Sequence, residues 1–135
     1  MTSTYLFVYG TLLKDTGNDM ASFLHAHSQC LGNGYFHGKL YKVSWYPGAV
    51  LSENTSENVH GKIFKIHDAA VFKVLDDYEG TGPNYPEPHL FKKHQVTAFL
   101  VDGTPVETIV YLYNLPLDGL RQIKSGDFIK HVSDS

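Results

Sequence analysis

Apolar residues recur along the chain at spacings typical of strands and of helices. The aromatic and β-branched run Tyr5–Tyr9 stops at Gly10, which predicts a buried strand followed by a turn. Apolar and polar residues alternate over Val59–Ile63, which predicts a half-buried strand. A helix is predicted between Asp68 and Gly80, because apolar residues recur there at helical spacing. Asp68 is a suitable N-cap, and Gly80 is a suitable residue to end the helix. Its apolar stripe consists of Val71, Val74, Leu75 and Tyr78.

A second helical stripe lies nearer the amino terminus. It begins at Asn18, a suitable N-cap, and we expect Gly32 to stop the helix. Strands are predicted over Gly34–Val43 and Ala49–Ser52, with Tyr46-Pro47-Gly48 as the turn between them. The helical stripe consists of Met20, Phe23, Leu24 and His27.

The carboxyl-terminal part carries the strongest short-range turn signal. Asp102-Gly103 separates the runs Val96–Val101 and Val106–Tyr113, which predicts a hairpin. A short piece, Leu120–Phe128, closes the domain. Because strands outnumber helices and do not alternate regularly with them, the pattern predicts an α+β domain whose sheet can curl into a barrel.

Size and charge narrow the classes of protein that this chain can represent. Its 135 residues fit one domain spanning 1–135. A net charge of −3, from 11 Lys and Arg against 14 Asp and Glu, argues against a nucleic-acid partner. No apolar run approaches the roughly 18 residues of a membrane span, and no signal peptide is recognisable. The lone Cys30 cannot form an internal disulfide. We therefore expect a cytoplasmic protein without membrane contact. A monomer or weak dimer is our working expectation, although the pattern of residues does not itself determine the oligomeric state.

Glu79 stands out because its position disfavours a carboxylate. The last turn of a helix presents unpaired carbonyl groups with a partial negative charge, and Asp76 and Asp77 add like charge. Such surroundings raise the pKa of a carboxyl group, which suits a general acid or base that works near neutral pH. The alternative is a solvated acidic helix end without a catalytic role.

The turn Tyr9-Gly10-Thr11-Leu12 offers a second chemistry. Successive backbone N–H groups after a buried strand can form a concave nest for an anion, and Gly10 permits close approach. A carboxylate would fit such a nest. The alternative is that Gly10 only lets the chain turn.

Other polar residues give weaker signals. The 8 histidines lack paired metal-ligand spacing, and His25 and His27 on a helix would point to different faces, so we expect no metal. Cys30 lacks a cationic neighbour, and no GxSxG elbow is present, so covalent catalysis has little support. Lys92-Lys93-His94 is most simply an exposed basic segment before a strand, and the alternative is that it steers an acidic substrate.

Several segments in this order resemble the gamma-glutamylcyclotransferase-like superfamily, which includes plant avirulence-induced proteins and mammalian gamma-glutamylamine cyclotransferases. The resemblance covers almost the whole chain. Phe7–Leu12 is similar to the family's first strand and substrate loop, and Leu75–Gly80 is similar to the segment that carries its catalytic glutamate. The other landmarks are Tyr46–Val50, Val59–Phe64, Tyr111–Tyr113 and Ile123–Phe128.

The resemblance implies a small mixed β-barrel of about five to seven strands with flanking helices. It also implies a cofactor-independent enzyme that releases 5-oxoproline from a small gamma-glutamyl amine or gamma-glutamyl amino acid. Glu79 would move the protons, and N–H groups of the Gly10–Leu12 turn would hold the substrate's α-carboxylate. The substrate-binding positions that the resemblance carries over are Tyr9, Gly10, Thr11, Leu12, Tyr46, Pro47, Gly48 and Tyr113.

Two departures from the family pattern leave the substrate open. Gly80–His89 forms a longer Pro-rich loop than in relatives, and Lys92 or Lys93 stands where an Arg is expected. Gamma-glutamyl amino acids, gamma-glutamyl-ε-lysine fragments and other gamma-glutamyl amines therefore remain candidates. A non-catalytic module on the same fold, which holds a small carboxylate while Glu79 anchors its amine, is the alternative function.

Overall fold

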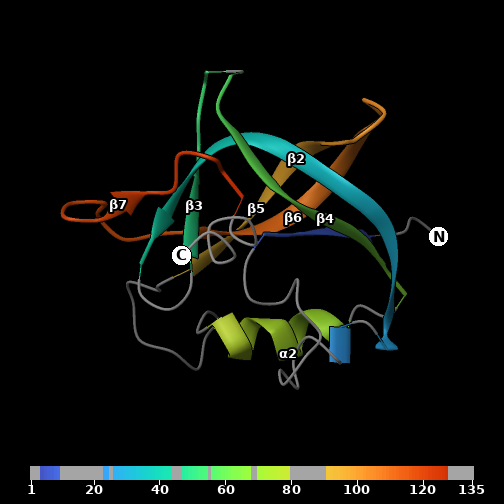
Figure 1. The fold of residues 1–135 in the computed structure, drawn as a ribbon. Helices are drawn as coiled ribbons and strands as arrows, with labels where there is room; N and C mark the ends of the chain where they lie inside the picture. Colours follow the sequence, from blue (N-terminus) through green and yellow to red (C-terminus); the bar gives the residue numbers. More distant parts are fainter. Residues whose placement is uncertain are drawn as a thin grey trace.

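Seven strands and a helix, α2, make up most of the chain that the computed structural model describes (Figure 1). The described residues are 4–9, 23–24, 26–43, 47–54, 56–67, 70–79 and 91–127, with the backbone alone for 76–79. The elements are β1 (Thr4–Val8), β2 (Ser28–Lys42), β3 (Pro47–Leu51), β4 (Asn58–Ile66), α2 (Ala70–Glu79), β5 (Phe91–Leu100), β6 (Pro105–Tyr113) and β7 (Arg121–Gln122). Within these ranges, no helix has the length and apolar content that a membrane crossing requires.

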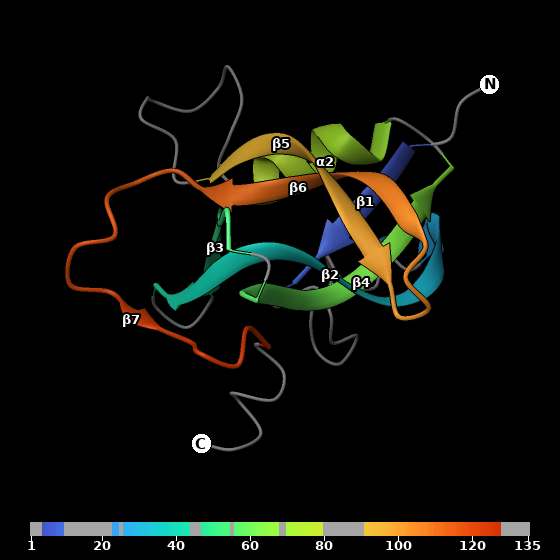
Figure 2. The same ribbon diagram turned by 90° about the horizontal axis from the view of Figure 1, so that it is seen from above.

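The strands β2, β4, β1, β6 and β5 close into a barrel (Figures 1 and 2). They are neighbours in that order, and the closing pairs between β2 and β5 are Gly34 with Leu100 and Tyr35 with Phe99. β1 and β6 run parallel while the other neighbours are antiparallel, so the barrel is mixed. β3 and β7 extend the far end of β2. The expected fold class, an α+β domain built on a small mixed barrel, is confirmed.

The long strand β2 corrects one predicted boundary. It begins at Ser28, so Gly32 lies inside a strand and does not stop the predicted first helix. The β2–β4 register shifts between Cys30 and Gly32, and Gly32 has a φ of 132°, which residues with a side chain rarely adopt. Gly32 therefore serves a β-bulge. Phe23 and Leu24 of the predicted helical stripe have helical backbone, and its earlier residues lie outside the described ranges.

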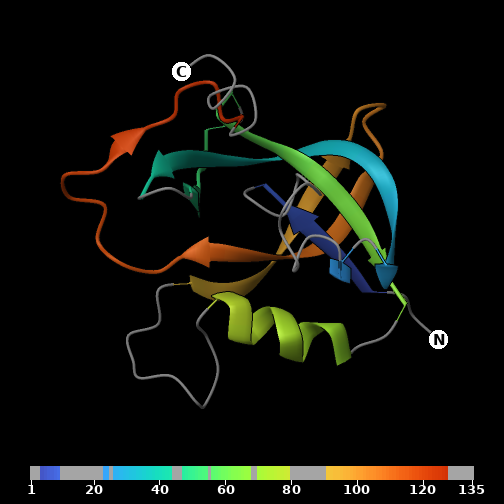
Figure 3. The ribbon, with the colours of Figure 1, turned by 60° about the horizontal axis from the view of Figure 1, so that its bottom comes forward.

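Two apolar clusters lie on opposite faces of the sheet. Side chains alternate along β1, so Phe7 joins the cluster inside the barrel while Leu6 and Val8 join the cluster beneath α2. Val71 and Leu75 of α2 are almost fully buried in this second cluster, as the helical stripe predicts. Figure 3 shows α2 covering that side of the barrel.

The predicted β5–β6 hairpin is confirmed, but β5 begins earlier than its apolar pattern indicates. Phe91 pairs with Tyr113, so Lys92–His94 belong to the strand and do not precede it. Pairing with the apolar strand β6 continues through the exposed residues Lys92–His94, which is why β5 includes them although their own sequence lacks an apolar pattern. Pro47 and Gly48 likewise open β3 and do not form the predicted turn.

Candidate active site

Several segments that the sequence singles out meet at one end of the barrel. Because β1 and β6 are parallel, the residues at their carboxyl ends, Tyr9 and Tyr113, lie toward the same end. β5 is antiparallel to β6, and its first residue, Phe91, pairs with Tyr113. β3 reaches the same region, where the Tyr9 phenol contacts Ala49. The barrel therefore gathers residues that are far apart in sequence.

Tyr9 connects three of these strands through its phenol oxygen. The hydroxyl donates a hydrogen bond to the carbonyl oxygen of Tyr111 at 2.5 Å and accepts one from the backbone N–H of Ala49 at 3.2 Å. The side chain is only 7% exposed, so water cannot easily replace these partners. These bonds fix the residue that directly follows β1.

Gly48 and Tyr113 pack too closely for a side chain at position 48. A Cβ on Gly48 would lie 2.8 Å from the Cβ of Tyr113 and 2.9 Å from a methyl carbon of Val43. The Tyr113 ring also meets Phe91 edge-on, with ring centroids 6.0 Å apart and an interplanar angle of 74°. Pro47 and Gly48 are buried, whereas Tyr113 is half-buried. Tyr113 therefore contacts the start of β3 and the start of β5 while keeping an accessible surface.

Glu79 is the last residue of α2. The carboxyl end of this helix lies beside the start of β5 and the end of β6 (Figure 3). The ammonium of Lys93 on β5 lies 5.8 Å from the centroid of the Phe72 ring, a cation–π contact between strand and helix. No basic residue occupies the last turn of α2, so the helix supplies no cation for its own terminal carbonyls. The side chain of Glu79 is outside the described structure, and its backbone ends α2 on the side of the barrel where β5 begins and β6 ends.

The structure describes four of the predicted substrate-binding positions and brings them together. These are Tyr9, Pro47, Gly48 and Tyr113. Four others, Gly10, Thr11, Leu12 and Tyr46, lie outside the described residues. In the part of the chain that is described, no three His, Cys, Asp or Glu side chains are close enough together to hold a metal ion.

Sequence reasoning missed the backbone groups that hold Tyr9. A tyrosine at the end of an apolar strand was the available signal, because a buried hydroxyl needs hydrogen-bond partners. The partners, at Ala49 and Tyr111, come from strands whose neighbours are set by barrel closure. The local pattern could not identify them for that reason.

Comparison with known proteins places these landmarks in one family. The family described as "Gamma-glutamyl cyclotransferase, AIG2-like" matches residues 6–130. The Gamma-glutamylcyclotransferase family protein YtfP of Escherichia coli K12 is 33% identical over 125 residues, covering 92% of this chain and 95% of YtfP.

Solved structures are similar over most of the chain. YkqA from Bacillus subtilis has a TM-score of 0.72 at 24% identity and covers 98% of this chain, which spans 43% of the longer YkqA chain. An aig2-like protein (ggact) from Mus musculus has a TM-score of 0.67 at 21% identity, with 86% of this chain and 82% of that chain covered. At these identities the likeness shows a shared fold.

Proposed function

The chain belongs to the AIG2-like gamma-glutamyl cyclotransferase family, and we propose that it releases 5-oxoproline from a small gamma-glutamyl compound. The family match over residues 6–130 carries this proposal. It is supported by the meeting of Tyr9, Gly48 and Tyr113 at the barrel end where α2 finishes.

The proposed reaction is an intramolecular acyl transfer. The substrate's α-amine, once it has lost a proton, attacks the γ-carbonyl carbon and forms the ring C–N bond of 5-oxoproline. The bond from that carbon to the leaving amine breaks, and the leaving nitrogen takes up a proton. Atoms and charges balance without water, a metal or a redox partner, so the protein must fold the substrate and move protons.

Glu79 is the proposed proton carrier. Its carboxylate would take the proton from the α-ammonium and return one to the departing amine. A well-placed general acid or base contributes on the order of 10²- to 10⁴-fold in rate. The end of α2, where backbone carbonyls carry partial negative charge, favours a carboxylate that accepts a proton readily.

The turn after β1 is the proposed site for the substrate's α-carboxylate. Backbone N–H groups of Gly10, Thr11 and Leu12 would bind it, and the buried phenol of Tyr9 would hold the turn in place. Tyr46, Pro47, Gly48 and Tyr113 are the proposed wall of the pocket. A substrate held by its α-carboxylate can fold into a near-attack geometry, which is worth about 7–11 kcal/mol in favourable intramolecular reactions.

A non-catalytic role on the same fold is the second candidate. In that case the turn would hold a small carboxylate, and Glu79 would anchor an amine without moving a proton. The acidic residue at the position of the family's glutamate favours the enzyme. The leaving group stays open between gamma-glutamyl amino acids, gamma-glutamyl-ε-lysine fragments and other gamma-glutamyl amines.

A substrate panel separates the two candidates. The purified protein is incubated with several gamma-glutamyl amino acids and amines, and 5-oxoproline is measured by mass spectrometry against a blank without protein. An enzyme forms 5-oxoproline from at least one compound in proportion to protein concentration. Saturable binding of these compounds without 5-oxoproline would support the binding module.

We further propose that the enzyme acts in the cytoplasm without a cofactor.

A further inference from the structure

Three basic residues stand at the start of β5, beside the candidate site. Lys92, Lys93 and His94 follow Phe91, whose ring contacts that of Tyr113, and all three are exposed. Figure 3 shows the start of β5 beside the carboxyl end of α2. The chain as a whole has a net charge of −3, so two adjacent lysines here differ from its general character. The geometry of the strand decides which of them faces the site.

Lys92 and Lys93 lie on opposite faces of the sheet, because successive residues of a strand alternate. Lys93 pairs with Tyr111 on β6, and both belong to the face that α2 covers, where the Lys93 ammonium contacts the Phe72 ring. Lys92 pairs with Leu112, which is buried in the cluster inside the barrel. Directly opposed residues of an antiparallel pair share a face, so Lys92 lies on the interior face of the sheet.

The interior face of β5 passes from the core to solvent toward the start of the strand. Ala98 is fully buried and Val96 is 8% exposed, whereas His94 and Lys92 on the same face are exposed. Tyr9 belongs to the same interior cluster as Val96 and Ala98. The interior face is therefore accessible at the end of the barrel where the candidate site lies, and Lys92 stands on that part of it.

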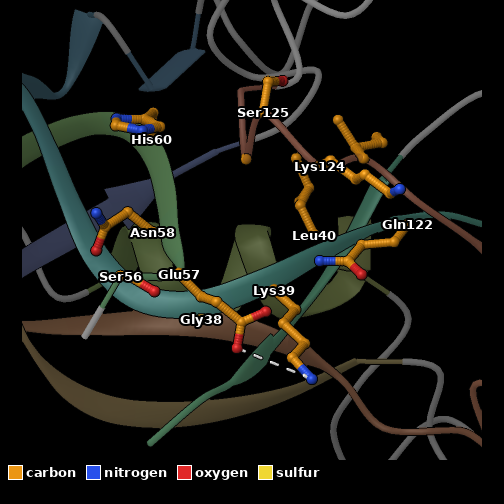
Figure 4. Close-up of a pocket in the computed structure, with 12 residues that line it drawn as sticks. Gly38, Lys39, Leu40, Ser56, Glu57, Asn58, His60, Gln122, Lys124 and Ser125 are labelled. Atoms are coloured by element: carbon orange, nitrogen blue, oxygen red, sulfur yellow. Dashed lines mark ion pairs between the residues drawn. The ribbon is translucent and has the colours of Figure 1, made fainter. Parts of the chain in front are cut away.

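Lys92 brings a positive charge to this end of the barrel. It has no ion-pair partner among the described residues, whereas Lys39, beside the pocket between β2, β4 and β7, is paired with Glu57 at 3.9 Å (Figure 4). A lysine ammonium is a point charge on a flexible four-carbon stem, so it can meet an anion over a range of positions. Lys92 therefore favours a ligand that carries a negative charge on this side of the site.

The start of β5 lies two strands away from the turn after β1. β6 separates β1 from β5, and neighbouring strands are about 4.8 Å apart, so about 10 Å separates their backbones. The two carboxylate carbons of a gamma-glutamyl amino acid are seven bonds apart, which spans about 9 Å when extended. Folding for ring closure shortens this distance, and the lysine stem can make up the difference. The spacing suits a substrate with one carboxylate at each end.

We propose that Lys92 selects substrates whose leaving amine carries a carboxylate, so that gamma-glutamyl amino acids are preferred to gamma-glutamyl amines. This inference rests on the proposed function, in which the turn after β1 binds the α-carboxylate of the gamma-glutamyl group. Lys92 is then a specificity-determining residue that binds the second carboxylate and takes no part in proton transfer.

Binding of two matched compounds tests this assignment. Gamma-glutamyl-alanine and gamma-glutamyl-ethylamide differ only in the carboxylate of the leaving amine. Their dissociation constants are measured by ¹H–¹⁵N NMR titration of the full-length Glu79→Gln variant, in which the proposed reaction is slowed. We expect gamma-glutamyl-alanine to bind about fivefold more tightly, the effect of one exposed ion pair. Adding Lys92→Gln to this variant should abolish the preference.

Lys93→Gln is the matched control, because Lys93 is the next residue and lies on the opposite face of the strand. It should keep the preference, and so should Lys92→Arg, which retains the charge. The proposal is overturned if the Glu79→Gln protein binds both compounds equally or binds neither. It is also overturned if Lys92→Gln keeps the preference or Lys93→Gln loses it equally. A preference that depends on Lys92, in a wild-type protein that forms no 5-oxoproline, would support this role and contradict only the proposed reaction.

Discussion

The phenol of Tyr9 donates its hydrogen bond to the carbonyl of Tyr111, 102 residues further along the chain, at a distance of 2.5 Å. The same oxygen accepts the N–H of Ala49, so a single atom joins β1, β3 and β6. The turn proposed to hold the substrate begins at the next residue, Gly10. A buried polar contact therefore holds the residue that directly precedes this proposed site, and apolar side chains cannot replace it.

Replacing Tyr9 with Phe should destabilise the protein by about 1–3 kcal/mol. The ring keeps its packing, but the carbonyl of Tyr111 and the N–H of Ala49 lose a buried partner, and leaving such groups unsatisfied costs that amount. Urea unfolding of the wild type and Tyr9→Phe measures the difference. We expect unchanged m-values, because the surface exposed on unfolding stays the same.

Tyr5→Phe is the matched control for this measurement. Tyr5 lies on β1, the strand that Tyr9 directly follows, and is half-buried, and its hydroxyl has no hydrogen-bond partner among the described residues. Its removal should change stability by less than about 0.5 kcal/mol. Equal losses for Tyr9→Phe and Tyr5→Phe would show that the three-strand contact does not stabilise the fold.

Gly48→Ala should destabilise the protein by about 1–3 kcal/mol, because the new methyl group overpacks a closed contact. It would lie 2.8 Å from the Cβ of Tyr113. A double-mutant cycle with Tyr113→Ala tests the cause, since removing the ring relieves part of the collision. We expect a coupling energy of about 0.5–3 kcal/mol. Strictly additive losses would mean that position 48 is sensitive for another reason.

Asp102 in the β5–β6 turn should make a small contribution to stability that depends on pH. Its pKa is lowered from the usual 3.8, chiefly by a hydrogen bond from the Thr104 side chain and then by the Thr104 backbone N–H at 2.9 Å. A carboxyl group with a lowered folded pKa stabilises the protein above the unfolded value, and this contribution disappears as pH falls through the folded pKa.

Thr104→Ala checks that assignment by NMR titration of the Asp102 carboxyl carbon. The variant loses the side-chain hydrogen bond and keeps the backbone one, so the pKa should move up toward its usual value without reaching it. Thr97→Ala, on the exposed face of β5 in the same hairpin, should leave the titration unchanged. An identical titration in wild type and Thr104→Ala would contradict the stated cause of the shift.

Sequence reasoning predicted best the elements in which the spacing of apolar residues agrees with the residues that begin, end or connect them. The stripe of Val71 and Leu75 between suitable helix ends identified α2, and Asp102-Gly103 between two apolar runs identified the hairpin. Both depend on neighbours in sequence. An α+β domain whose sheet can curl into a barrel could also be inferred from the pattern, and the small mixed barrel from the family resemblance. The closure of the barrel through Tyr35 and Phe99 could not, because it depends on contacts between distant strands.

The predicted end of the first helix and the predicted start of β5 were wrong because pairing with a distant strand determines both. Gly32 carries the signal of a helix stop, but pairing with β4 overrides it and makes the residue part of a bulge. Lys92–His94 have no apolar alternation, and β5 includes them because β6 supplies a partner ladder. The sequence itself singled out Glu79 and the Tyr9–Leu12 turn, and the family resemblance added Gly48 and Tyr113. The contact of Gly48 with Tyr113 follows from three-dimensional packing.

The central claim is that the carboxylate of Glu79 moves the protons of ring closure. The most direct measurement is the rate of 5-oxoproline formation by Glu79→Gln, with Asp77→Asn as the matched control on the same helix end and unfolding curves for both. We predict that both variants fold as the wild type does, that Asp77→Asn keeps its turnover, and that Glu79→Gln loses about 10²- to 10⁴-fold. A folded Glu79→Gln protein that forms 5-oxoproline at the wild-type rate would contradict the account.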